Sequence, residues 1–171
     1  MVASTTLGTV RHRPLSPSPS PTRGEESISR ILATVLALLA THAHSVSPSA
    51  YNIVNGGIPV ALTDAPGDAI KGRLIAGNRQ VGMCLLCHQA PIAEDRFQGD
   101  ISTNLAGVGA RWTVPQLRLR IVNSRQINPA SIMPAYYRTD RLFRVAVSSR
   151  DKPILDAQQI EDVVAWLETL K

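Results

Sequence analysis

The sequence has few of the residues on which many binding sites depend. It holds only two cysteines and four histidines among 171 residues, whereas a structural zinc site needs four ligands, usually from two Cys or His pairs. It has no glycine-rich loop of the kind that cradles a phosphate, and no Ser/His/Asp set. Aromatic residues make up only 4%, so a bound apolar group could supply part of the core.

Long apolar runs and a large excess of one charge are also missing. The apolar run Ile31–Ala40 is shorter than the roughly 20 residues that a transmembrane helix needs. The net charge is +5, but residues 1–45 hold four arginines against two glutamates, so the remainder carries +3. We therefore expect no stable membrane span in the mature chain and no basic face for nucleic acid.

The N-terminal part predicts export. Residues 1–30 are of low complexity and rich in Ser and Pro, and Arg30 precedes the apolar run, which small residues follow up to Ser45. This order is typical of a signal peptide within residues 1–45 and predicts a periplasmic protein; the alternative is an uncleaved core helix behind a tail. Residues 46–66, with three prolines and two glycines, predict an irregular extension or a partner-binding arm. Residues 67–171 are expected to form the domain.

Both cysteines lie in one motif, Cys84-Leu85-Leu86-Cys87-His88. A C-x-x-C-H run is typical of covalent haem c attachment. On a helical turn, residues three and four apart share a face, so both thiols can reach the two porphyrin vinyl groups while His88 binds the iron. A thioredoxin-like dithiol or a zinc site remains an alternative, although neither requires this histidine at this position.

Three helices are expected in the domain, which makes its fold class all-α. The first begins at the N-cap Asp68, and the second at Thr113 with Gln116 at the capping-box position; the last begins at Asp156 with Gln159 at that position. The apolar stripes expected to be buried are Ile70, Leu74 and Ile75; Leu117, Ile121 and Val122; and Ile160, Val163, Val164, Leu167 and Leu170. Arg118, Arg120 and Arg125 are expected on a solvated face of the second helix. The last helix should pack across the first.

The second axial ligand of the iron is predicted by elimination. His88 is the only histidine of the expected domain, and Met83 lies beside Cys84, too close to reach the opposite face of the haem. Met133 therefore remains, with a thioether typical of electron-transferring cytochromes; the alternative is a methionine that fills core space. The loop of residues 89–111 is expected to supply the carbonyl that fixes the other ring nitrogen of His88. Arg111, the last residue of that loop, and Trp112 after it are candidates to meet a haem propionate; the alternative for Arg111 is a solvated surface charge.

The order of elements is a first helix, the haem motif, a loop, a second helix, a methionine segment and a last helix, and it resembles the class I cytochrome c fold wrapped around one haem. A closer similarity lies in Arg73, Gly82–His88, Arg96–Gly99, Leu105–Arg111, Gln116–Arg120, Ile132–Thr139 and Lys152–Leu155. On these stretches the sequence resembles the SoxX family, the small monohaem subunits of the SoxAX cytochromes of bacterial sulfur oxidation. Relatives often carry a proline just ahead of the Leu-Ala-Gly run, where this chain has Ser102-Thr103-Asn104.

The resemblance implies a role as an enzyme subunit. SoxAX acts as an L-cysteine S-thiosulfotransferase, which oxidatively joins thiosulfate to a cysteine of the carrier SoxYZ. By this analogy the catalytic haem belongs to the SoxA-type partner. His88 and Met133 would hold one electron-transfer haem c that passes electrons to a small cytochrome c, and no residue of this chain would be catalytic. Three alternatives are a free-standing periplasmic electron carrier, a ligand-binding or peroxidase-like haem protein with an open iron, and a haem-free zinc or dithiol module.

Overall fold

The computed structural model describes residues 50–171; the expected signal segment lies outside them. The α-helices are α2 (Ala69–Gly77), α3 (Val108–Arg111), α4 (Val114–Asn123) and α5 (Ala157–Thr169), and the 3-10 turns are η1 (Cys84–Leu86), η2 (Ser124–Gln126) and η3 (Val147–Ser149). Within the described residues there is no strand, only an isolated bridge between Val54 and Gly57. The all-α expectation is confirmed for this part of the chain.

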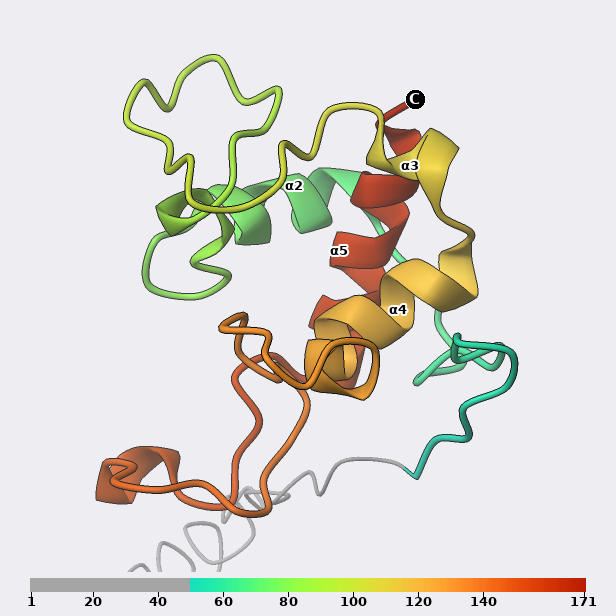
Figure 1. Ribbon diagram of the computed structural model, residues 1–171, viewed down its shortest axis with the longest axis vertical. Helices are drawn as coiled ribbons and strands as arrows, with labels where there is room; N and C mark the ends of the chain where they lie inside the picture. The colour runs from blue at the N-terminus through green and yellow to red at the C-terminus, as the bar shows by residue number, and fades with distance from the viewer. Residues whose placement is uncertain (1–49) are drawn as a thin grey trace, which may run out of the picture. The chain divides into compact units, whose positions relative to one another are not determined.

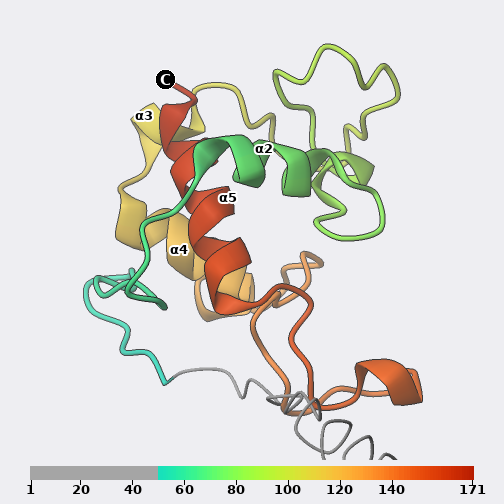
Figure 2. The same cartoon turned by 180° about the vertical axis from the view of Figure 1, so that it is seen from behind.

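Helix α2 crosses α5, as expected, and the two lie against each other in Figures 1 and 2. Contact is so close that a Cβ atom on Gly72 would overlap the main-chain oxygen of Asp162. The buried face of α2 is formed by Gly72 and Ala76, whereas Ile70 and Leu74 are 76% and 64% exposed. The expected apolar stripe was therefore wrong for Ile70 and Leu74, because the crossing needs small residues for close approach, whereas Ile75 does pack partly buried against the core.

The sequence signals at the start of α4 and α5 are confirmed. Thr113 with Gln116 and Asp156 with Gln159 form complete capping boxes, which satisfy main-chain N–H groups that would otherwise lack partners. Most of the expected apolar stripe of α5 is buried, together with Trp166. The buried residues of this core are Ile58, Ala76, Leu85, Ile92, Leu105, Val108, Leu117, Leu119, Ile121, Val122, Tyr136, Tyr137, Leu155, Ala157, Ile160, Val163, Val164, Trp166 and Leu167.

Helix α4 is covered on more than one side, which corrects the expectation for Arg118. Its guanidinium is buried and makes a two-pronged ion pair with Glu161 of α5, with Nε–Oε1 and Nη2–Oε2 distances of 2.7 and 2.8 Å. A third donor, Nη1, bonds the carbonyl oxygen of Ile58 at 2.6 Å. Ile58 itself is 1% exposed, so part of the segment of residues 46–66 packs on this domain and shields α4 from solvent.

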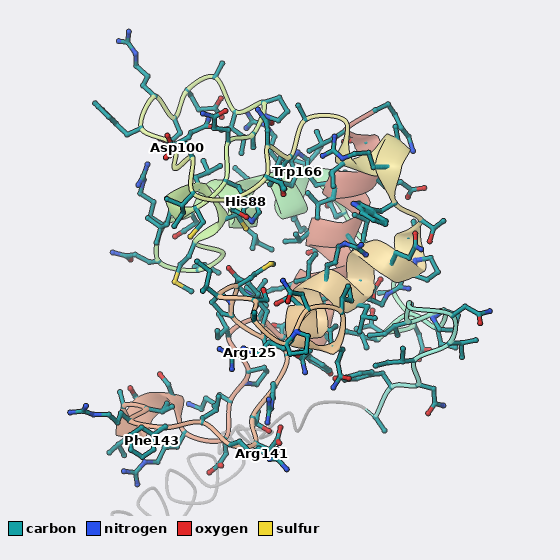
Figure 3. The ribbon with its side chains drawn as sticks, in the orientation of Figure 1. His88, Asp100, Arg125, Arg141, Phe143 and Trp166 are labelled. Carbon is teal, nitrogen blue, oxygen red and sulfur yellow. The ribbon has the colours of Figure 1, made fainter. Side chains whose placement is uncertain are left out.

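Residues 138–154, between Tyr137 and Leu155, lie mostly at the surface. Figure 3 shows Arg141 and Phe143 on a segment that extends away from the helices, and the side chain of Phe143 is 87% exposed. Its two ends are tied together where the Leu155 N–H donates to the Tyr136 carbonyl at 3.0 Å. Among the residues that the structure describes, no helix has the length and apolar character needed to cross a bilayer.

Candidate haem site

The C-x-x-C-H motif forms a tight turn directly after α2. Residues Cys84–Leu86 make the 3-10 turn η1, and the N–H groups of Cys87 and His88 both donate to the Cys84 carbonyl, at 3.2 and 2.9 Å. This turn places both thiols and the imidazole within one short segment, and neither thiol is in a disulfide. Burial raises the pKa of Cys84 to about 11, so in the haem-free chain this group is a protonated thiol at neutral pH.

The imidazole of His88 is fixed by a main-chain oxygen. Its Nδ1 lies 2.6 Å from the carbonyl oxygen of Thr103. A carbonyl oxygen can only accept, so Nδ1 carries the proton and Nε2 keeps its lone pair, which is the tautomer that a metal ligand needs. The segment expected as a loop over residues 89–111 therefore supplies this carbonyl, within Ser102-Thr103-Asn104, although its last residues, Val108–Arg111, form α3.

The loop that carries Thr103 is itself bonded to the haem-motif turn. The Gly99 N–H donates to Leu85 O at 2.8 Å, and the Ser102 N–H donates to Cys87 O at 3.0 Å. Both acceptors lie in the C-x-x-C-H motif. The histidine and the carbonyl that orients it thus belong to one network of main-chain hydrogen bonds.

Met133 lies on a segment that runs beside the C-terminal end of α4. Two main-chain bonds hold this segment, from Tyr136 N–H to Ile121 O at 3.2 Å and from Tyr137 N–H to Val122 O at 3.4 Å. The Tyr136 hydroxyl donates to the carbonyl oxygen of Gly82, two residues before Cys84, at 2.6 Å. Tyr136 therefore ties the Met133 segment to the haem-motif turn.

Two adjoining cavities of about 380 and 550 Å³ open between the His88 and Met133 segments. We call them together the central cavity, because both are lined by His88, Ser102, Asn128, Ser131 and Met133. Cys84 and Cys87 line the smaller one. Each volume lies within the range of about 300–1,000 Å³ that is usual for cofactor sites. The structure thus brings all four predicted site residues to one cavity.

The electrostatics of the larger part of the central cavity suit an anionic group. Arg111 and Arg120 line it, and no carboxylate is among the residues that do so. Arg111 donates to the carbonyls of Ala106 and Asn104, at 2.8 and 2.9 Å. The guanidinium of Arg120 stacks on Trp112, with its carbon 3.6 Å from the ring centroid, and desolvation lowers its pKa.

The central cavity therefore passes a chemical test for haem c. Thiols, an oriented imidazole and a thioether supply the covalent and axial ligands, apolar side chains such as Leu105 and Ile121 line the walls, and cations without carboxylate partners suit the propionates. The axial roles of His88 and Met133 stay predictions. Arg120 had been expected on a solvated face, and the structure places it on the cavity wall.

The sequence interpretation missed two serines. Ser124, at the end of α4, and Ser131 both contact the main chain of Met133. No local pattern marks them, because a serine after a helix and a serine in a proline-flanked loop are common at turns. Their pairing across seven residues of sequence became visible only in the fold.

Comparison with known proteins agrees with this site. A cytochrome c family model matches residues 74–171. Among solved structures, the chain is similar to one chain in the crystal structure of SoxXA from P. pantotrophus, with 39% sequence identity and a TM-score of 0.67. That match covers 74% of this chain and 98% of the other. No curated protein sequence matches.

Membership of the cytochrome c family implies a covalently attached haem c, and Cys84 and Cys87 occupy the attachment positions. The family match covers more than half of the chain. The match in three dimensions extends over nearly all of the chain in the SoxXA structure, and the helical domain agrees with the expected class I fold. The chain therefore belongs to the cytochrome c family and, within it, to the SoxX cytochromes.

Proposed function

We propose that this chain is the electron-transfer subunit of a SoxAX complex, an L-cysteine S-thiosulfotransferase of sulfur oxidation. The observation that carries the proposal is the 39% identity to a chain of the SoxXA structure, with 98% of that chain covered. The reaction joins thiosulfate to a cysteine thiol of the SoxYZ carrier, forms an S–S bond, and releases two electrons and one proton. The SoxA-type partner would hold the catalytic haem, and this chain would pass the electrons, one at a time, to a small cytochrome c.

The residues of the central cavity support electron transfer rather than bond-making. Cys84 and Cys87 would fix the porphyrin, and His88, oriented by Thr103, would bind the iron on one face. Met133 would bind it on the other, which leaves no coordination position for a substrate. Haem with His and Met ligands supplies reversible one-electron chemistry at a raised potential.

Reconstitution with a SoxA-type subunit tests this proposal. The two chains would be co-expressed in a host that matures haem c, purified through a tag on the partner, and mixed with SoxYZ and thiosulfate. We expect a one-to-one complex in which thiosulfate reduces the haem of this chain only when SoxYZ is present. A chain that stays separate from the partner yet exchanges electrons with small redox proteins would contradict the proposal and support the free-standing carrier.

We also propose that the chain works in the periplasm. The support is the signal-like pattern within residues 1–45, together with the need to attach haem c outside the bacterial cytoplasm. N-terminal sequencing of the haem-containing protein from a periplasmic extract tests it. A new terminus near residue 45 is expected, and an intact Met1 on haem-loaded protein would contradict it.

A further inference from the structure

Two serine hydroxyls join the N–H and the C=O of Met133. The Ser131 Oγ accepts the Met133 N–H at 3.3 Å, the two Oγ atoms of Ser131 and Ser124 lie 2.9 Å apart, and the Ser124 Oγ lies 3.2 Å from the Met133 carbonyl oxygen. Only one arrangement of the hydroxyl protons satisfies all three contacts. A carbonyl can only accept, so Ser124 donates to Met133, and Ser131 must then donate to Ser124.

The contacts therefore form a closed circle that begins and ends on Met133. Within such a circle, each hydroxyl accepts one bond and donates one, so the bonds polarise one another and act together. Ser124 is only 8% exposed, so an unpartnered hydroxyl there would carry a desolvation cost. We therefore expect that removal of either hydroxyl weakens all three hydrogen bonds together.

The circle is attached to the end of α4. The N–H groups of Ile127 and Asn128 both donate to the Ser124 carbonyl, at 3.0 Å each, and Arg125 Nε donates to Ser131 O at 3.2 Å. These bonds fix the position of the Met133 main chain relative to α4. The other side of this helix carries the buried Arg118–Glu161 pair. The thioether, which has three rotatable bonds, starts from a fixed point.

We propose that Ser124 and Ser131 are positioning residues that keep the thioether of Met133 available to the iron. This rests on the proposed function, because it requires Met133 to be an axial ligand. Among the described residues, both hydroxyls bond the main chain of Met133 rather than its thioether. They act by holding the main chain of Met133, so that less conformational freedom is lost when the thioether binds.

Competition between added imidazole and the Met133 thioether for the iron measures how strongly the serines favour methionine binding. Ferric holoprotein would be titrated with imidazole, and loss of the far-red methionine–iron band would be recorded for the wild type, Ser124→Ala and Ser131→Ala. One lost hydrogen bond is worth about 0.5–1.5 kcal/mol, so each variant should bind imidazole roughly two- to tenfold more tightly. The double variant should exceed either single variant by little, because each change breaks the same circle.

Ser149→Ala is the matched control. Ser149 is an exposed serine of η3 and is not among the residues that line the central cavity; we expect wild-type imidazole affinity. Ser131→Thr keeps a hydroxyl and should restore that affinity. A loss of packing alone would lower the thermal midpoint without a selective change in imidazole affinity.

The possible outcomes distinguish the positioning role of the two serines from the axial-ligand role of Met133, on which it depends. If wild type and Met133→Ala bind imidazole equally, Met133 is not a ligand, and the ligand assignment of the proposed function fails. If Met133→Ala binds far more tightly while both serine variants behave like Ser149→Ala, the ligand assignment stands and the positioning role is overturned. Should Ser124→Ala fail to fold, Ser131→Ala, at a partly exposed position, decides the question.

Discussion

The two sides of the central cavity are built by different means. On the histidine side, the imidazole is oriented by the Thr103 carbonyl, and the loop around it is bonded to the motif through further main-chain groups. On the methionine side, main-chain bonds to α4 reach Tyr136 and Tyr137, but the N–H and C=O of Met133 itself are bonded through the hydroxyls of Ser124 and Ser131. Main-chain groups survive most substitutions, whereas hydroxyls do not. The histidine side should therefore tolerate changes in its supporting residues, and the methionine side should respond to them.

The covalent attachment gives the histidine side a further advantage. His88 directly follows Cys87, so haem attachment keeps the iron close to the imidazole even when other contacts open. Met133 lies in a segment far along the chain and is held only by non-covalent contacts. The comparison predicts a graded series of effects, which the following variants test.

The largest effect is expected from removing both attachment thiols. Cys84→Ala combined with Cys87→Ala should abolish covalent haem, because no other cysteine exists in the chain. Haem staining of a denaturing gel measures this, with Met133→Ala as the control that should keep its stain. Covalent haem in the double variant would refute the attachment role of these residues.

Met133→Ala should leave the haem attached but open the iron. The reduced protein should then bind carbon monoxide readily, and the midpoint potential should fall by part of the roughly 0.8 V range over which axial ligands set haem potentials. Met83→Ala is the matched control, because Met83 also lines the central cavity but lies beside Cys84. An unchanged spectrum in Met133→Ala would show that the methionine side does not contribute a ligand.

The sequence could predict only those features of the site and of its supporting helices that depend on residues close together in the chain. The C-x-x-C-H motif, the capping boxes and the stripe of α5 depend on residues close in sequence, and they were predicted correctly. Arg118 was placed on a solvated face because helical periodicity reports one buried side, whereas α4 is covered also by Ile58 and Glu161. Such burial arises from segments 43 and 60 residues away, which no local pattern encodes.

The next test concerns the buried Arg118–Glu161 ion pair, which joins α4 to α5. Glu161→Ala leaves the buried guanidinium of Arg118 unpaired and the Leu62 N–H without its carboxylate acceptor at 2.9 Å. Loss of one partner of a buried pair costs about 3–5 kcal/mol in the free energy of unfolding. Urea unfolding of the haem-loaded protein measures it, and the far-red methionine band should disappear at a lower urea concentration than in the wild type.

Glu168→Ala provides the control for that experiment, since Glu168 lies on the exposed side of α5. A surface substitution of this kind usually changes the free energy of unfolding by less than about 0.5 kcal/mol. Equal stability of the two variants would show that the buried pair contributes nothing specific to the helix on which the methionine side depends.

A smaller effect is expected from Arg120, the α4 cation that lines the central cavity. Arg120→Gln removes a positive charge that favours the reduced iron, so the midpoint potential should fall by an amount on the order of tens of millivolts. Arg120→Lys keeps the charge but loses part of the planar stacking on Trp112, and its potential should stay closer to that of the wild type. Equal potentials in Arg120→Gln and the wild type would mean that this charge does not act on the haem.

The smallest effect is expected at Thr103, and it tests the comparison most directly. Thr103→Ala removes an exposed side chain but keeps the carbonyl that accepts the His88 Nδ1–H. The midpoint potential, the imidazole affinity and the unfolding free energy should all stay at wild-type values, within about 0.5 kcal/mol for the last. A Thr103→Ala effect as large as that of Ser124→Ala would contradict the contrast itself, because the histidine side would then depend on a side chain just as the methionine side does.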